Sequence, residues 1–276
     1  MKRITLLVVV LVAAAISSAL AFGATGTKTG GLPTIDVAMD GSSITVSGNL
    51  ESGAVNIHST STGTTPGAPL FIRLNPGVTA DQVIAFLQTK KAADPNYVAD
   101  YGAIVFDPGQ TTGDIQTVLQ PADYVAFDSS GNNPADWPHT TFTISNNPYP
   151  QKLPAMQQWQ KSAEFRFYGQ KTLHNGEVIR ASNAGFLVHM LVGIGAKNEA
   201  AGKKMVKALR AGHDSAVAKL ATPNSFSAFG PLSHGAVAQY VFNAKPGWYV
   251  EACFMDTQDG REHTQLGMER LVHVVN

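Results

Sequence analysis

The chain has 276 residues, with 20 basic and 20 acidic side chains, so its formal net charge is zero. A balanced charge without basic clusters offers no surface for a nucleic acid, and we expect none as a partner. Charged residues make up only 14% of the chain, whereas Gly (26 residues) and Pro (15 residues) are plentiful, which is typical of a β-rich exported protein with many turns.

The first residues have the pattern of a secretory signal. Lys2 and Arg3 precede an apolar run over residues 4–16, and Ala19 and Ala21 are small residues at the positions that a signal peptidase reads. The run is shorter than the roughly 20 residues that span a membrane. We therefore predict a signal peptide over residues 1–21 and a secreted or periplasmic mature chain without a membrane anchor.

Short strands and one helix are predicted in the first half. The helix, over residues 80–91, has apolar residues at helical spacing and Thr79 as its N-cap. Strands are expected at 35–37, 43–46, 54–58, 103–106, 115–119, 124–127 and 140–144. The Asn- and Pro-rich segment 145–150 ends this half, and we place a linker at 151–161.

The second half repeats this order. Strands are expected at 163–168, 177–182, 187–194, 236–241, 248–254 and 271–275, with a helical stretch at 198–220. Segments 121–125 and 246–250 both read Pro-x-x-Tyr-Val, and each precedes a loop that contains a histidine. The sequence therefore predicts an all-β fold of two Greek-key β-sandwich domains, over residues 33–147 and 160–276, each with a helical insertion.

Cys253 is the only cysteine. An exported protein with disulfides has an even number of cysteines. A lone thiol in an oxidising compartment must be buried, paired with another chain, or bound to a metal.

The residues around Cys253 form a pattern that points to a metal. Tyr249 lies four residues before Cys253, and His263 and Met268 follow in one loop, while His189 begins an apolar strand far upstream. Nine residues separate Cys253 from His263, and four separate His263 from Met268. This order and spacing resemble the cupredoxin (blue copper) family, including its exported plastocyanin-like bacterial members.

The resemblance implies a cupredoxin-like fold and one copper ion in a type 1-like site formed by His189, Cys253, His263 and Met268. A thiolate, two imidazoles and a weak thioether suit both Cu(I) and Cu(II). The implied function is electron transfer to a redox partner protein, with His263 reaching the surface as the electron port. A copper carrier with the same ligands and a metal-free binding or structural module remain as alternatives.

Two positions depart from the family pattern. Val188 stands where a proline usually precedes the upstream histidine, and Glu251 lies two residues before Cys253. Alternation along a strand points Glu251 to the same side as the thiol. A buried carboxylate there requires a bulge or a charged partner.

The first half is interpreted as a degenerate copy without metal ligands. Aligning the two Pro-x-x-Tyr-Val segments places Asp128 opposite Cys253, and aligning the loop histidines places His139 opposite His263 and Ile144 opposite Met268. Pro69 stands near the place of His189.

The sequence also leads us to expect that the chain is not an enzyme. Cys253 is flanked by Ala252 and Phe254, so the His-Cys-His sequence of multicopper oxidases is missing. Motifs for a serine nucleophile, a phosphate loop, a dinucleotide site and a zinc protease are missing as well.

Overall fold

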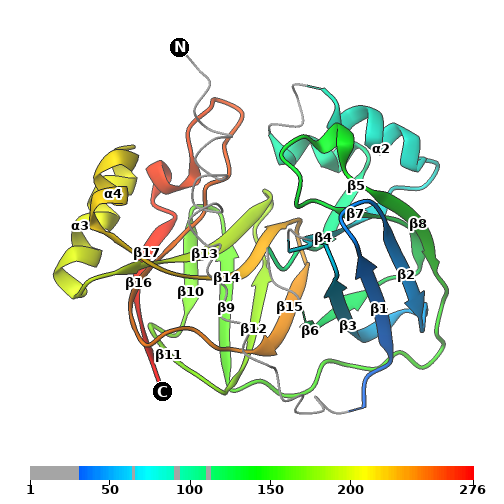
Figure 1. The fold of residues 1–276 in the computed structure, drawn as a ribbon, viewed down its shortest axis with the longest axis horizontal. Coiled ribbons are helices and arrows are strands. Elements are labelled where there is room, and N and C mark those ends of the chain that lie inside the picture. The colour runs from blue at the N-terminus through cyan, green and yellow to red at the C-terminus, as the bar shows by residue number, and fades with distance from the viewer. Residues whose placement is uncertain (1–30, 64–65, 90–93, 110–112) are drawn as a thin grey trace.

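The computed structural model describes residues 31–276 except 64–65, 90–93 and 110–112. The predicted signal peptide lies outside the described residues. The predicted all-β class is confirmed: strands dominate both halves, and short helices lie at the periphery (Figure 1). No described helix has the length and apolar character of a membrane span.

The first half is a β-sandwich of two four-strand layers. One layer has the strand order β6-β3-β1-β2, and the other has the order β5-β4-β7-β8. The strands are β1 (Thr34–Met39), β2 (Ile44–Gly48), β3 (Gly53–Ser61), β4 (Pro69–Leu74), β5 (Gly102–Phe106), β6 (Gly113–Leu119), β7 (Ala122–Asp128) and β8 (His139–Ile144). Between β4 and β5 lie the helix α2 (Ala80–Leu87) and the 3-10 helix η2 (Pro95–Asp100), and η3 (Pro134–Asp136) precedes β8.

The second half is a sandwich of the same kind. Its layers have the orders β10-β9-β12-β15 and β11-β17-β16-β13-β14. The strands are β9 (Gln158–Ala163), β10 (Arg166–Gly169), β11 (Thr172–His174), β12 (Val178–Asn183), β13 (His189–Ala196), β14 (Ala221–Leu232), β15 (Val237–Val241), β16 (Gly247–Ala252) and β17 (Glu269–Val275). The helices α3 (Glu199–Arg210) and α4 (Asp214–Leu220) lie between β13 and β14, and η4 (His263–Leu266) precedes β17.

The two halves are internal repeats. In the first, β1 pairs in parallel with β3 and antiparallel with β2, and in the second, β9 pairs in the same way with β12 and β10. The helical insertion follows β4 in the first copy and its equivalent β13 in the second. Tyr124 and Tyr249 are both buried, and each donates its hydroxyl to the carbonyl four residues upstream, at 2.7 and 2.6 Å. The predicted pair of sandwiches, each with a helical insertion, is confirmed.

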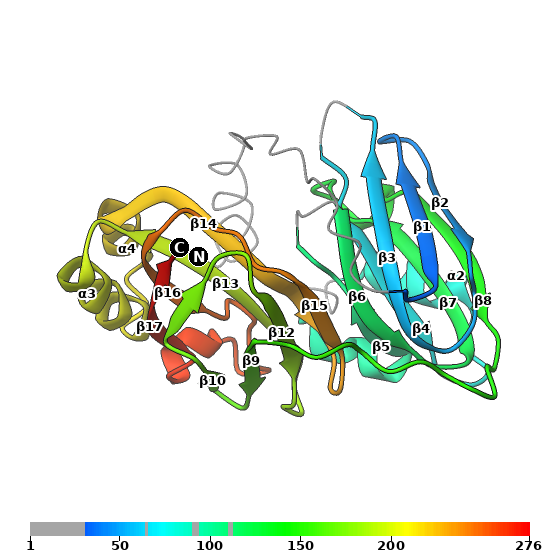
Figure 2. The same cartoon turned by 90° about the horizontal axis from the view of Figure 1, so that it is seen from below.

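One sheet runs through both halves. β6 pairs antiparallel with β15, its equivalent in the second copy, so the eight strands follow the order β10-β9-β12-β15-β6-β3-β1-β2 (Figure 2). Gln116 and Gln239 face each other at this seam, and Gln239 Nε2 donates to Gln116 Oε1 at 2.9 Å. The two halves are therefore joined by a shared sheet. We keep residues 33–147 and 160–276 as the proposed bounds of the two domains.

The predicted linker at 151–161 is partly wrong. β9 begins within it at Gln158, and the carbonyl of Pro154 accepts a bond from Arg180 at 2.7 Å. The inward face of β9 consists of Gln158, Gln160 and Ser162, all buried. An alternation of buried and exposed polar residues has no hydrophobic period, so the sequence gives no strand signal here.

Other element predictions also differ from the structure. β4 and β14 were not predicted, because β4 begins with Pro69 and does not alternate, and β14 contains Pro223 and Gly230, which indicate a loop. The pairing of β14 with β13 contains register shifts that accommodate such residues. The single helix predicted at 198–220 is divided at Gly212, whose φ is 67°.

Asp107 lies at the contact between the halves and predicts a pH-dependent stability. It is buried after β5, close against Gly230, and its carboxylate accepts a bond from the Gly109 N–H at 2.7 Å. Burial raises the pKa of Asp107 to about 7, and the Gly109 bond opposes this only in part. Between its ordinary pKa and 7 the folded chain therefore holds a proton that the unfolded chain has lost, so stability falls as pH rises over this interval and is level above it.

Asp107→Asn is expected to raise the free energy of unfolding at both pH values, by about 1–3 kcal/mol more at pH 8 than at pH 5. Urea unfolding at the two pH values measures the difference, with the exposed Asp123→Asn as control. An equal effect of Asp107→Asn at both pH values would contradict the prediction.

Candidate metal centre

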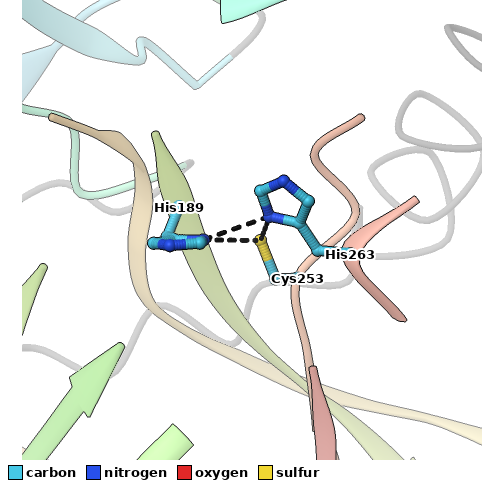
Figure 3. Close-up of side chains that lie close together, drawn as sticks. All are labelled: His189, Cys253 and His263. Carbon is cyan, nitrogen blue, oxygen red and sulfur yellow. Dashed lines mark hydrogen bonds between the residues drawn. The ribbon is translucent and has the colours of Figure 1, made fainter. Parts of the chain in front are cut away.

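The strand pairing brings the predicted ligand segments together. β13 and β16 are neighbours, and the pair Val192–Ala252 places the start of β13 beside the end of β16. His189 is the first residue of β13, and Cys253 directly follows β16. Their side chains lie at the same end of this sheet, and His263 reaches them from the loop that leads to β17 (Figure 3).

The three side chains converge on one point. Cys253 Sγ lies 3.3 Å from His263 Nδ1 and 3.9 Å from His189 Nδ1, and the two Nδ1 atoms are 3.1 Å apart. All three side chains are fully buried. Among the residues that the structure describes, they are the group of His, Cys, Asp or Glu side chains placed closely enough to hold a metal ion.

These positions fit a single ion. An ion bound at about 2.0 Å by two imidazoles and about 2.3 Å by a thiolate needs ligand atoms about 3–4 Å apart. Both rings turn their Nδ1 atoms toward the sulfur (Figure 3). Nε2 of both His189 and His263 is buried without a hydrogen-bond partner. One sulfur and two nitrogens form the soft donor set that copper prefers.

Backbone hydrogen bonds fix the loop that carries His263. The His263 N–H donates to the Met255 carbonyl at 2.8 Å, and the Met268 N–H donates to the His263 carbonyl at 2.9 Å. The Cys253 N–H donates to the Met268 carbonyl at 3.3 Å. Met268 is fully buried, and its backbone is hydrogen-bonded to both Cys253 and His263.

The segment before His189 is organised by the buried side chain of Asn183. Its Nδ2 donates to the carbonyls of Leu187 and Leu232 at 2.8 and 2.7 Å, and its Oδ1 accepts from the Gly185 N–H at 2.8 Å. After the turn, the Met190 N–H points at Cys253 Sγ at 3.4 Å. The thiol therefore has a backbone donor as well as two imidazole neighbours.

Burial keeps all three groups uncharged when no metal is bound. It lowers the pKa of His189 to about 3, helped by His263 and opposed by Glu164. It lowers the pKa of His263 to about 4, against Asp94 and Glu164. Burial raises the pKa of Cys253 to about 12, and the backbone N–H groups of Met190 and Met255 oppose it only weakly. The free thiol is therefore protonated and unreactive, while the imidazoles are ready to bind a cation without losing a proton.

The turn between β9 and β10 covers the site. Glu164 Oε1 lies 3.9 Å from His189 Nε2 and accepts bonds from the N–H groups of Phe186 and Leu187. Phe165 packs its ring edge-on against His263, with centroids 5.2 Å apart, and its φ of 54° is the one positive φ among the described non-glycine residues. No sequence signal revealed this pair, since a Glu-Phe turn contains no typical turn residue.

Gly185 makes room between His189 and Glu164. A Cβ atom at this position would lie 2.6 Å from His189 Nε2 and 2.8 Å from Glu164 Oε1. Both contacts are too short, so a larger residue here would have to displace the His189 ring and the Glu164 carboxylate.

The two departures from the family pattern have structural explanations. Glu251 is fully buried and pairs with Arg270, whose Nε lies 2.5 Å from Glu251 Oε2, so the expected charged partner is present. Val188 is also buried, and its N–H donates to Asn96 of the first half at 2.7 Å, a bond that the usual proline could not make.

One expectation about His263 is wrong. The resemblance implied that its ring reaches the surface as an electron port, yet His263 is fully buried. The ring of Phe165 packs against it. The exposed residues beside the site are Glu164 and Phe186, and the latter is 91% exposed.

In the first half the structure replaces the predicted alignment with another. β7 pairs with β8 so that Phe127 faces His139, and β16 pairs with β17 so that Ala252 faces Glu269. His139 therefore corresponds to Glu269, not His263, and the counterpart of Met268 is Pro138, not Ile144. Aligning histidines failed because the two loops differ in length.

The places of Cys253 and His189 are filled differently in the first half. Asp128 stands opposite Cys253 as predicted and is buried, and its carboxylate accepts from the Ala68 N–H at 3.0 Å, where Met190 donates to the thiol. Register then places Gly67, not Pro69, opposite His189. Met39 occupies the space beside Gly67, since a Cβ there would lie 2.7 Å from its sulfur.

Comparisons with known proteins concern the fold. No family model and no curated protein matches the sequence. Auracyanin from the photosynthetic bacterium Roseiflexus castenholzii is 18% identical over 43% of this chain and 95% of its own, with a TM-score of 0.26. A Cu-containing nitrite reductase from Thermus scotoductus is 11% identical over 88% of this chain and 67% of its own (TM-score 0.26), and a multicopper oxidase is 10% identical over 88% of both (TM-score 0.24).

The cupredoxin-like fold recognised in the sequence does not rest on these matches. It is confirmed by the sheet arrangement and the His-Cys-His group of the chain itself. At TM-scores this low, the matches add no weight to the assignment of the site.

The expectation that the chain is not an enzyme is overturned. Two of the proteins similar to it over 88% of its length are named as a reductase and an oxidase. The expectation was based on the residues that flank Cys253. These residues concern only the site at Cys253, so they do not exclude an enzymatic activity of the whole protein.

Proposed function

We propose that this chain binds one copper ion through His189, Cys253 and His263, with Met268 as a weak axial ligand, and that the site transfers electrons. The observation that supports the proposal best is the convergence of Cys253 Sγ and two imidazole Nδ1 atoms within 4.8 Å of one another. Copper in such a site alternates between Cu(I) and Cu(II).

The chain's own residues favour a site that changes little between the two oxidation states. Two ligands lie at the ends of paired strands, and the third lies in a loop closed by the backbone bonds of His263 and Met268. Burial excludes water from the three ligand side chains. The Met190 N–H directed at the sulfur supports a thiolate rather than a thiol once a cation is bound.

The proposal extends to export and to a partner. We place the protein outside the cytoplasm or in the periplasm, where a lone cysteine needs the protection that a metal provides. Its redox partner would be a protein that approaches the site. Since His263 is buried, we expect approach at the turn formed by Glu164 and Phe165.

Titration of the purified protein with Cu(II) tests the copper site. The wild-type protein is expected to develop an intense visible thiolate-to-copper charge-transfer band at one ion per chain, and Cys253→Ser should lack it. A wild-type protein that stays colourless and keeps a titratable thiol would contradict copper binding. An electron-transfer site should then cycle repeatedly between a reductant and an oxidant with its copper retained, whereas a copper carrier should release the metal to an acceptor.

A further inference from the structure

The first half contributes a contact to the candidate metal centre of the second half. η2 follows α2 in the first half, and its second residue is Asn96. The Val188 N–H donates to Asn96 Oδ1 at 2.7 Å, directly before His189. The entry of the chain into the ligand-bearing strand β13 is therefore held by a side chain 92 residues away in sequence.

The same side chain also faces the loop between Cys253 and His263. Asn96 Nδ2 donates to the carbonyl of Asp256 at 3.5 Å and to Asp94 Oδ1 at 2.8 Å. One amide group thus contacts both segments that supply ligands. A flipped amide would place its NH2 group against the Val188 N–H and its oxygen against two oxygens, so the network determines the orientation.

Asn96 is itself held in place at the start of η2. Asp94 is the N-cap, and its Oδ1 accepts from the backbone N–H of Asn96 at 2.9 Å. Pro95 occupies the first helical position, where its fixed φ suits the turn. A side chain on such a restrained backbone can transmit a defined position to its contacts.

We propose that Asn96 is a positioning residue through which the first half sets the distance between His189 and the loop that carries His263. The inference rests on the copper site proposed above. It gives the first half a role in the metal site of the second half, although the first half has Gly67 and Asp128 at the positions of His189 and Cys253. Removing a group that is hydrogen-bonded to a metal ligand commonly changes metal affinity about 10–100-fold, and Asn96, which bonds to Val188 and Asp256 rather than to a ligand, is expected at the low end of this range.

Asn96→Ala tests the proposal, with Asn133→Ala as a matched control. Asn133 caps η3 in the same half through its own side chain, which accepts from the Ala135 N–H. In the metal-free protein, Asn96→Ala should speed hydrogen exchange of the Val188 amide about tenfold or more, and the control should not. In the copper-loaded protein, Asn96→Ala should shift the charge-transfer band and weaken copper binding about tenfold, while the control matches wild type.

Asn96→Asp separates the two contacts and serves if Asn96→Ala does not fold. It keeps an acceptor for Val188 but loses the donor to Asp256, so it should restore the exchange protection while leaving the copper spectrum altered. If wild type binds copper and Asn96→Ala equals Asn133→Ala in both exchange and spectrum, the inference is wrong. A wild type without the copper band would instead remove the proposed function.

Discussion

A His189→Gly variant is expected to lose the intense visible band and to bind copper at least about 100-fold more weakly, more than the loss of an outer contact costs. The reason is geometric: His189 Nδ1 is one of three ligand atoms, and no other histidine ring lies beside Cys253 apart from His263 among the described residues. Added imidazole should enter the vacated space and restore part of the band, which a visible titration with and without imidazole would measure.

His139→Gly is the control for this experiment. Alignment of the loop histidines suggested it as a ligand counterpart, but the strand register places it opposite Phe127 at the exposed start of β8. It should leave the spectrum unchanged. A full-strength band in His189→Gly without imidazole would show that the copper ligands lie elsewhere.

Arg270→Ala should have the largest effect on stability, lowering the free energy of unfolding by about 3–5 kcal/mol. Glu251 is fully buried, and its Oε2 is paired with Arg270 Nε at 2.5 Å, while its Oε1 has no partner. The guanidinium also donates to the carbonyls of Phe167 and Gly169 at 3.4 and 3.3 Å. Its removal leaves a carboxylate without a counter-charge in a dry interior. Urea unfolding would measure the loss.

The pH dependence of this loss has a defined sign. Burial raises the pKa of Glu251, and Arg270 opposes the rise through its charge and hydrogen bond. Without Arg270 the pKa of Glu251 rises further in the folded state. The folded state is therefore destabilised most at high pH, where Glu251 ionises in the unfolded chain. The loss should be larger at pH 8 than at pH 5. The double variant Glu251→Gln/Arg270→Ala should recover part of it, and a double variant no more stable than Arg270→Ala would argue against the unpaired charge as the cause.

The sequence predicted the site better than it predicted the surroundings of the site. The resemblance to the cupredoxin pattern suggested His189, Cys253, His263 and Met268 as ligands, and the structure brings the first three close together. Glu164, Phe165 and Asn96 were missed. Each contacts the site across a large separation in sequence, which no local pattern encodes.

The fold shows the same division. Strands with alternating or β-branched apolar residues, such as β3 and β16, were predicted, whereas the polar inward face of β9 gave no signal. The repeat was visible in the tyrosine segments because both copies need the same hydroxyl-to-carbonyl bond. The correspondence of the loops could not be predicted, since the number of residues before the last strand differs and only the strand register defines it.

The pairing of β6 with β15 joins like to like, as in a symmetric dimer of identical subunits. Tandem duplication of a single-domain ancestor that associated through this edge would produce the present polypeptide. The copies differ at this axis, for example where Arg180 faces Gln239 and Asn56 faces Gln116. Arg180 donates to Gln239 Oε1 at 2.7 Å, and the Gln239 amide turns its NH2 group across the axis. The contact between the two glutamines therefore has a defined direction, whereas two identical subunits could make it in either sense.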